Sequence, residues 1–146
     1  MYVYVLQLES EKYYVGVAKD IGLRLWTHFK MNGKTGSAWT KKYPPIAVLH
    51  CSECSNHPSV FKNIEKQCTL RLAKLKGFRN IRGSGYCLSA DEYPASWDDQ
   101  LDAVTPADMS KMRPLNQKEL KRLIKGKYQL WLSKRREGIA SRNADH

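Results

Sequence analysis

Residues 1–18 read MYVYVLQLESEKYYVGVA, and they carry the clearest structural pattern in the sequence. β-branched and aromatic residues alternate over residues 1–8 and again over residues 12–18, a pattern typical of paired strands. A short Glu-Ser-Glu-Lys turn separates the two runs. The pattern therefore predicts a β-hairpin.

An amphipathic helix is expected directly after the hairpin, over about residues 20–31. Asp20 can cap its free N–H groups, and an apolar residue recurs every four positions as a buried stripe. This stripe consists of Ile21, Leu25 and Phe29. Arg24 and His28 share the neighbouring face of the helix, one turn apart.

A second, longer helix is expected over residues 58–76. Pro58-Ser59 suits its first turn, and Gly77 suits a left-handed stop. Its buried positions are Phe61, Ile64, Cys68, Leu72 and Leu75. Glu65 lies at the edge of this apolar stripe, so its carboxylate could point into a cleft. Between the two helices, Pro44-Pro45 precedes an expected strand at residues 46–50.

Charge is divided unevenly along the 146 residues, which carry a formal net charge of +11. Residues 1–87 hold 14 Lys and Arg against 5 acids, residues 88–110 hold 6 acids and no base, and residues 111–146 hold 11 bases against 3 acids. Two basic blocks around an acidic spacer suit a polyanionic partner, because each neutralised phosphate releases counterions. The alternative is a solvated basic surface without a partner.

This division suggests three segments: a core at residues 1–87, an acidic Pro-containing linker at residues 88–115, and a basic helix with a tail at residues 116–146. One short helix is expected inside the linker, around residues 97–103. Asn116 can cap the last helix, whose apolar stripe needs a partner, most simply the core. Only the last few residues are expected to form a loose tail.

Four cysteines without a secretory leader indicate free thiols of a reducing compartment. The run from His50 to His57 places a C-x-x-C between two histidines, and zinc accepts both residue types. The four ligands would be His50, Cys51, Cys54 and His57. A second C-x-x-C is lacking and four ligands within eight residues would crowd the loop, so we favour a polar loop after a strand over a zinc site.

No apolar run approaches the roughly 18 residues that a membrane-spanning helix needs. The first residues also lack the basic leader, the apolar stretch and the cleavage site of a signal peptide. We therefore expect no membrane partner and a cytoplasmic location, or action in the cytoplasm of a host cell. None of these features specifies an oligomeric state.

Hydrolysis of a phosphodiester requires a base for water, a divalent ion, a cation for the developing charge, and positioning groups. The hairpin tyrosines, the Arg24/His28 pair, Glu65 and Asn80 are residues of the types that such a site requires. A tyrosine beside a metal or a cation can have its pKa lowered enough to take a proton from water. One carboxylate suffices to hold Mg²⁺ if phosphate and waters fill the remaining octahedral positions.

At this point the sequence resembles the GIY-YIG nucleases. Tyr2-Val3-Tyr4 stands where the first triplet belongs and Tyr14-Val15-Gly16 where the second belongs, although the family's name-giving glycine is replaced by Tyr2. The residues that follow in the family's order are Arg24, His28, Glu65 and Asn80. The resemblance covers about residues 1–87. It implies an α+β fold with a small central antiparallel sheet flanked by helices, to which a basic C-terminal helical extension is added.

The resemblance also implies roles for individual residues. Tyr4 would be the general base or its close partner, Tyr14 would orient water or the scissile phosphate, and Gly16 would permit close backbone approach. Arg24 would stabilise the transition state, and Glu65 would bind Mg²⁺ or Mn²⁺.

Further residues are expected around this site. His28 could be an alternative base or hold a phosphate, and Asn80 would support the site. Arg79 and Arg82 are expected phosphate contacts. Lys41-Lys42 is expected to be a solvated or phosphate-contacting loop.

The sequence thus predicts a metal-dependent endonuclease acting on DNA, with RNA as the alternative substrate. A non-catalytic nucleic-acid-binding module on the same fold is the competing hypothesis. A module released from catalysis would need no complete set of Tyr4, Tyr14, Arg24 and Glu65, so the set favours the enzyme. A zinc-stabilised scaffold is a third hypothesis, which depends only on residues 50–57.

Overall fold

The computed structural model describes residues 1–30, 37–103 and 111–125. At its centre is a five-stranded sheet with the strand order β4-β2-β1-β3-β5. The strands are β1 (Tyr2–Leu8), β2 (Lys12–Ala18), β3 (Pro45–Cys54), β4 (Ile81–Gly83) and β5 (Met112–Pro114). The helices are α1 (Ile21–Lys30), α2 (Ala38–Lys42) and α3 (Pro58–Lys76), with 3-10 segments η1 (Glu9–Glu11) and η2 (Ala95–Ala103). A further helix occupies residues 117–125.

The expected hairpin and the α+β fold are confirmed. β1 pairs with β2 and β3 in antiparallel fashion, and β3 pairs with β5 in the same way. The exception is β4, which pairs in parallel with Tyr13–Val15 of β2, so the sheet is mixed. Strands β2, β1, β3 and β5 thus form the antiparallel part of the sheet, and β4 is its only parallel neighbour among the described strands.

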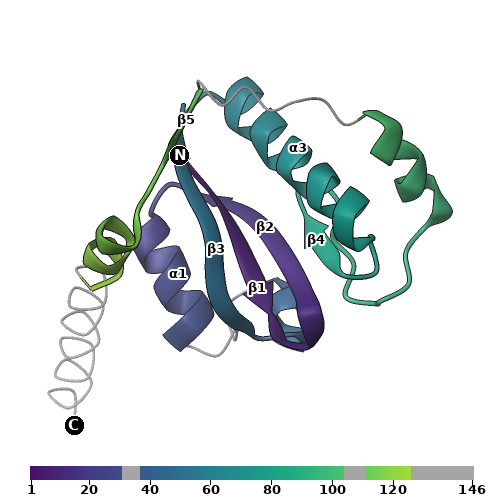
Figure 1. Ribbon diagram of the computed structural model, residues 1–146, viewed down its shortest axis with the longest axis horizontal. Helices are drawn as coiled ribbons and strands as arrows, with labels where there is room; N and C mark the ends of the chain where they lie inside the picture. Colours follow the sequence, from purple (N-terminus) through teal and green to yellow (C-terminus); the bar gives the residue numbers. More distant parts are fainter. Residues whose placement is uncertain (31–36, 104–110, 126–146) are drawn as a thin grey trace, which may run out of the picture.

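Alternation along β1 divides the core into two layers, because successive side chains point to opposite faces of a sheet. Tyr4, Leu6 and Leu8 pack with residues of α1 and with Trp39 of α2. Val3 and Val5 pack on the other face with Val15 and with α3. The sheet accordingly stands between α1 and α3 (Figure 1).

The two expected helices form where the sequence predicted them. Asp20 Oδ1 accepts a hydrogen bond from the backbone N–H of Leu23 at 3.2 Å, as a capping residue does. α3 begins with Pro58 in its first turn. It ends at Gly77, whose φ of 81° is a conformation that favours glycine.

The polar loop expected after residue 50 is wrong, because β3 continues to Cys54. Tyr2 of β1 pairs with Glu53, and β5 pairs with Ser52 to Cys54 on the other side. Two neighbouring strands therefore hold this segment extended despite its polar residues. The short helix α2 was not expected; it begins at Ser37, whose Oγ accepts from Thr40 N at 3.2 Å.

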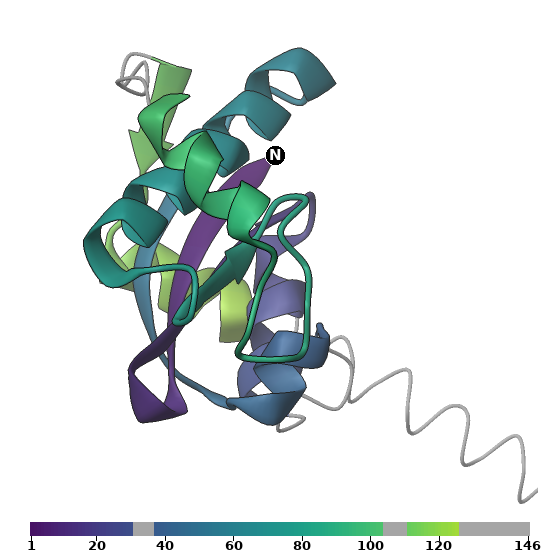
Figure 2. The ribbon, with the colours of Figure 1, turned by 90° about the vertical axis from the view of Figure 1, so that its right-hand side faces the viewer.

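The acidic stretch expected to be a linker touches the core through a few side chains, although most of its described residues are exposed. Tyr93, Trp97 and Leu101 contact a cluster that includes Phe78 and Tyr86, and η2 lies against α3 (Figure 2). The apolar contacts of these aromatic side chains thus hold the stretch on the core, although its composition is acidic. Further along, residues 112–114 form β5.

The last described helix packs on the core, as its apolar stripe suggested. Leu120 is buried in the same cluster as Tyr4 and Leu25, and Asn116 Oδ1 accepts from Glu119 N at 2.9 Å, which confirms the expected cap. Residues 126–146, which include the expected tail, lie outside the described residues, as do 31–36 and 104–110. Over the described ranges, no helix combines the length and apolar character needed to cross a bilayer.

Candidate active site

Tyr4 and Gly16 face one another across the central hairpin. They are directly paired in the register of β1 and β2, and the Tyr4 side chain is fully buried. A Cβ atom at position 16 would lie 2.5 Å from Tyr4 Oη and 2.9 Å from Tyr14 Cε1, well inside van der Waals contact. Glycine is therefore required here so that the Tyr4 ring can lie across β2.

Arg24 and His28 of α1 both reach the Tyr4 hydroxyl. Arg24 Nε donates to Tyr4 Oη at 3.2 Å, and Tyr4 Oη lies 3.1 Å from His28 Nε2. The spacing of four residues puts both side chains on one face of the helix, above the same phenol. The result is a hydrogen-bonded chain from a guanidinium through a phenol to an imidazole.

Tyr14 completes this aromatic group on the neighbouring strand. Its ring centroid lies 6.3 Å from that of Tyr4 and 6.0 Å from that of His28. The positive charge of Arg24 also acts to lower the pKa of Tyr14, against the effect of burial. The charge of Arg24 therefore acts on the hydroxyl groups of both Tyr4 and Tyr14.

Burial determines the protonation of the group. Burial lowers the pKa of His28 to about 4, and the positive charge of Arg24 acts in the same direction. Burial also raises the pKa of Tyr4 well above its ordinary value of 10.0, although Arg24 counteracts this. At neutral pH the histidine is therefore neutral and the phenol protonated, so Tyr4 O–H can donate to His28 Nε2.

The burial of one polar atom of His28 lowers the folding stability of the protein. The His28 side chain is 1% exposed, and its Nδ1 atom has no hydrogen-bond partner among the described residues. A buried polar atom without a partner costs about 1–3 kcal/mol. Such groups in a native fold call for a functional explanation.

Glu65 of α3 acts on the same tyrosines. Its negative charge raises the pKa of both Tyr4 and Tyr14. The carboxylate is half-buried; burial raises the pKa of Glu65, and Ser84 and Lys62 partly offset this. β4 ends at Gly83 opposite Val15, so the turn that carries Ser84 follows beside the tyrosine pair.

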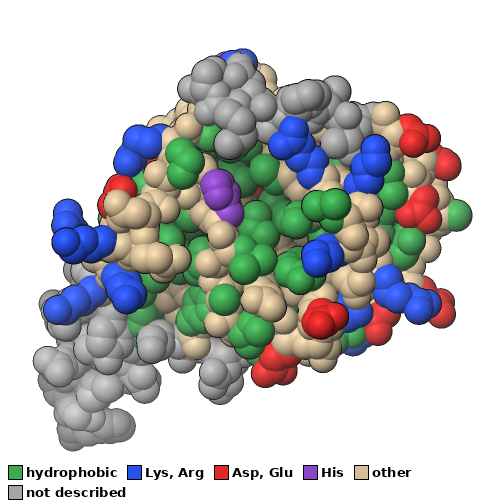
Figure 3. Space-filling view, viewed as in Figure 1, with side chains coloured by type: hydrophobic (Ala, Val, Ile, Leu, Met, Phe, Trp, Pro, Cys, Tyr) green, Lys and Arg blue, Asp and Glu red, His purple; other side chains and the backbone are tan. Residues whose placement is uncertain are grey.

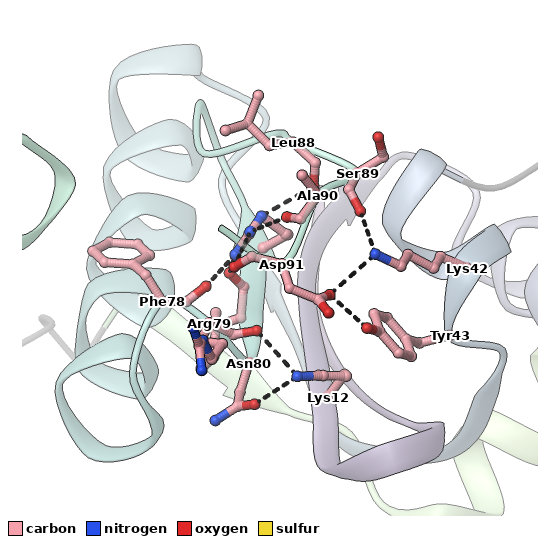
Figure 4. Close-up of polar contacts among 12 residues, drawn as sticks. Lys12, Lys42, Tyr43, Phe78, Arg79, Asn80, Leu88, Ser89, Ala90 and Asp91 are labelled. Atoms are coloured by element: carbon pink, nitrogen blue, oxygen red, sulfur yellow. Dashed lines mark hydrogen bonds and ion pairs between the residues drawn. The ribbon is translucent and has the colours of Figure 1, made fainter. Parts of the chain in front are cut away.

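Asn80 is not brought to this group. Its Oδ1 accepts from Lys12 Nζ at 2.9 Å (Figure 4). Its Nδ2 donates to the Lys76 carbonyl at 2.7 Å. Lys12 lies four residues before Gly16 on β2, about 13 Å along an extended strand. Among the described residues, the hydrogen bonds of the Asn80 side chain therefore do not reach Tyr4, Tyr14, Arg24, His28 or Glu65, and its expected support of the site stays a prediction.

Arg82 was expected to contact phosphate, and the structure contradicts this. The side chain is 1% exposed and stacks 4.2 Å from the centroid of the Trp39 ring. Its guanidinium donates to backbone carbonyls that lie before and after it in the chain. The acceptors are the carbonyls of Phe78, Ile81, Leu88, Ala90 and Asp91. Arg82 thus holds the chain after β4 and has no donor left for a ligand.

The remaining expected phosphate contacts lie on the surface. Lys42 forms an exposed ion pair with Asp91 at 3.2 Å and also donates to the Ser89 carbonyl. Lys41 and Arg79 are exposed. Contact between these three residues and nucleic acid stays a prediction.

The four residues considered for zinc do not converge. Cys51 packs in the cluster on the α1 face of the sheet and Cys54 in the cluster on the α3 face. The His57 side chain caps α3 by accepting from Ser59 N. Within residues 1–30, 37–103 and 111–125, no group of three or more His, Cys, Asp or Glu could hold a metal ion.

Two residues near the tyrosine pair had no role assigned from the sequence, namely Ser84 and Cys87. The Ser84 hydroxyl acts to lower the pKa of the Glu65 carboxylate. The Cys87 thiol donates to the Ser84 carbonyl at 3.1 Å. The glycine-rich run at 82–86 was the available signal, because such a run indicates a tight turn that can approach other groups closely.

Comparison with known proteins gives one finding. The family model of the GIY-YIG catalytic domain matches residues 1–77. This range, more than half of the chain, contains Tyr4, Tyr14, Arg24, His28 and Glu65, whereas Asn80 and Arg82 follow it. Neither the curated proteins nor the solved structures gave a match.

Proposed function

The chain belongs to the GIY-YIG family, and we propose that it is an endonuclease that hydrolyses phosphodiester bonds in DNA with one divalent cation held by Glu65. The observation that carries this proposal is the buried chain from Arg24 through Tyr4 to His28, on which the charge of Glu65 acts. Nucleic acid is the substrate class that the family implies.

Tyr4 is the group that takes a proton from the attacking water. As its oxygen accepts that proton, its own proton passes along the 3.1 Å contact to His28 Nε2. A free phenolate is never required, which suits a phenol whose pKa is raised. Tyr4 and His28 thus act as a general base together.

His28 becomes a better acceptor when substrate is bound. In the free protein its pKa is lowered by burial and by the charge of Arg24. A phosphate beside Arg24 brings negative charge that offsets this effect, so the pKa of His28 rises. Proton transfer is therefore favoured only with substrate in place.

Arg24 opposes the charge that develops on the phosphoryl oxygens. Its Nε donates to Tyr4, which leaves the terminal nitrogens of the guanidinium for Tyr14 and the phosphate. Stabilisation of this kind is strongest in a site shielded from water. Tyr14, held by the same guanidinium, positions the water or the phosphate.

Glu65 fits the cation by its chemistry. Mg²⁺ prefers carboxylate oxygen and keeps several waters, so one half-buried carboxylate near the phosphate position suffices. When bound, the cation would supply a positive charge against the phosphoryl and leaving oxygens. The protein's part is to hold Glu65 at this place on α3.

The charge distribution supports a nucleic-acid partner. Lys62 and Lys66 lie on α3 on either side of Glu65 in sequence and are exposed. Acidic side chains gather beside η2 (Figure 3). The two lysines beside Glu65 favour an approach of phosphates to α3.

The cation step is tested with Glu65→Gln, using Glu9→Gln as the matched control because Glu9 is exposed in the hairpin turn. Cleavage of labelled plasmid, single-stranded and branched DNA, and of RNA, is followed with Mg²⁺, with Mn²⁺ and with a chelator. We expect Glu65→Gln to lose roughly 10²-fold or more in rate, since a cation contributes several kcal/mol. The control should match the wild type.

Two outcomes contradict the proposal. Cleavage by Glu65→Gln at the wild-type rate would remove the cation assignment. Binding of nucleic acid by the wild type without cleavage of any of these substrates would instead support a non-catalytic binding module.

A further inference from the structure

We propose that Ser84 is a positioning residue that holds the Glu65 carboxylate ready for a divalent cation; this inference rests on the proposed function. The turn Gly83–Tyr86 brings Ser84 to α3. No role was assigned to this turn from the sequence or the family match, which ends at residue 77.

The turn is tightly closed. Gly83 N donates to the Tyr86 carbonyl at 3.1 Å and Tyr86 N donates back to the Gly83 carbonyl at 2.9 Å. The Cys87 thiol adds a third bond, to the Ser84 carbonyl. Ser84 and Gly85 are thus the two residues at the tip.

The base of the turn is pressed against both elements of the site. A Cβ atom at Gly83 would collide with the backbone oxygen of Val15, between Tyr14 and Gly16 on β2. It would also lie 3.1 Å from Thr69 Oγ1, one helical turn after Glu65. Thr69 Oγ1 in turn donates to the Glu65 carbonyl at 2.8 Å. The tip therefore projects beside Glu65.

Both ends of the turn are fixed by one side chain. Arg82 precedes the turn, and its guanidinium donates to the carbonyls of Leu88 at 3.0 Å and Ala90 at 2.6 Å after it. Since Arg82 is buried, these bonds are shielded from water. The tip is therefore presented by a rigid base.

The backbone of Ser84 is in a conformation that favours glycine. Its φ is 53°, and a non-glycine residue there costs about 1 kcal/mol. The Ser84 hydroxyl acts to lower the pKa of the half-buried Glu65 carboxylate, against the effect of burial. The side chain thus gives the site something that glycine could not. A fixed carboxylate needs less ordering when it binds an ion, which is the known effect of hydrogen bonds to ligating groups.

The effect of the backbone conformation is distinguished from the effect of the hydroxyl group by comparing Ser84→Gly with Ser84→Asn. Glycine relieves the positive φ and removes the hydroxyl, whereas asparagine tolerates this φ and offers an amide N–H donor. Ser10→Gly is the matched control, because Ser10 also has a positive φ of 59° but is exposed in the hairpin turn.

The readout is the affinity of the full chain for Mn²⁺, measured by electron paramagnetic resonance without nucleic acid, together with the Tm. We expect Ser84→Gly to keep or raise the Tm while it weakens Mn²⁺ binding about tenfold. Ser84→Asn should retain affinity within about threefold, and Ser10→Gly should leave it unchanged. In cleavage assays, Ser84→Gly should need more Mg²⁺ for half-maximal rate, and saturating Mg²⁺ should restore kcat.

Unchanged Mn²⁺ affinity in Ser84→Gly would overturn the role of Ser84. Glu65→Gln in the same measurement distinguishes this failure from that of the proposed function. If Glu65→Gln loses Mn²⁺ binding and Ser84→Gly does not, only the Ser84 inference falls. If Glu65→Gln binds Mn²⁺ like the wild type, the cation proposal falls as well.

Discussion

At Tyr4, a single hydroxyl group connects two neighbours of different character. Arg24 donates to it, and His28, kept neutral by burial, can accept from it. The charge of Arg24 acts to lower the pKa of both partners, while burial raises that of the phenol. The direction of the proton through this chain is therefore set by the environment of each group.

The buried His28 makes folding stability depend on pH. The unfolded chain takes up a proton near the ordinary pKa of 6.5, whereas the folded protein resists it until about 4. Stability from this group is therefore full above pH 6.5 and is lost as the pH falls toward 4. The loss amounts to about 3 kcal/mol for an isolated group.

This dependence is measured by Tm between pH 7 and pH 4 for the wild type and His28→Gln. The wild type should lose more stability than the variant over this interval, since all other titrating groups are shared. Parallel curves for the two proteins would show that His28 titrates normally in the folded state.

At the scale of elements, the segment after β4 is held by an arginine that the sequence suggested for phosphate binding. The local sequence around Arg82 does not indicate that this arginine is buried. Its acceptors are backbone carbonyls up to nine residues away, and a carbonyl can belong to any residue type. The stacked Trp39 comes from a different part of the chain. Periodicity, in contrast, predicted α1 and α3, whose apolar stripes are local.

Replacement of Arg82 by Met should destabilise the protein by about 3–5 kcal/mol. The substitution leaves several buried carbonyls without a donor, which is among the costly mechanisms of mutation. Thermal unfolding measures this, with Arg79→Met as the exposed control expected to stay within about 0.5 kcal/mol. An Arg82→Met protein as stable as the control would mean that water replaces these bonds.

The same comparison explains which parts of the site were predictable. Tyr4, Tyr14, Arg24, His28 and Glu65 lie on strands and helices that local patterns predicted, and the resemblance to the family selected these residues as the site. Ser84 lies on a turn whose position depends on the contact of Gly83 with Val15, and no local pattern encodes that contact. The extension of β3 to Cys54 likewise depends on pairing with β5, some sixty residues later.

At the scale of the whole molecule, the described C-terminal residues 111–125 are part of the folded core. β5 extends the sheet, and Leu120 is buried with Tyr4 and Leu25. Removal of all residues from 111 onward would therefore expose part of the core. A change in DNA binding by such a protein could then come from loss of folding instead of loss of phosphate contacts. A cut after residue 125 leaves the described packing intact.

Deletion of residues 126–146 removes 5 Lys and Arg and 2 Asp and Glu. If these bases contact phosphates, the slope of log affinity against log salt concentration should become shallower by up to about four. Binding of a labelled DNA duplex at several salt concentrations measures this, with Tm as the check on folding. An unchanged slope in a folded protein would assign the segment a role other than phosphate contact.

We propose that the Tyr4 hydroxyl takes the proton of the attacking water. This step is tested by single-turnover cleavage of the DNA substrate that the wild type cuts fastest, comparing Tyr4→Phe with Tyr13→Phe. Tyr13 lies on the same hairpin, but its ring faces Lys76 at 5.6 Å instead of the Arg24–His28 pair. We predict a loss of about 10²–10⁴-fold for Tyr4→Phe, with DNA binding retained and Tyr13→Phe unchanged. Cleavage by Tyr4→Phe at the wild-type rate would contradict the account.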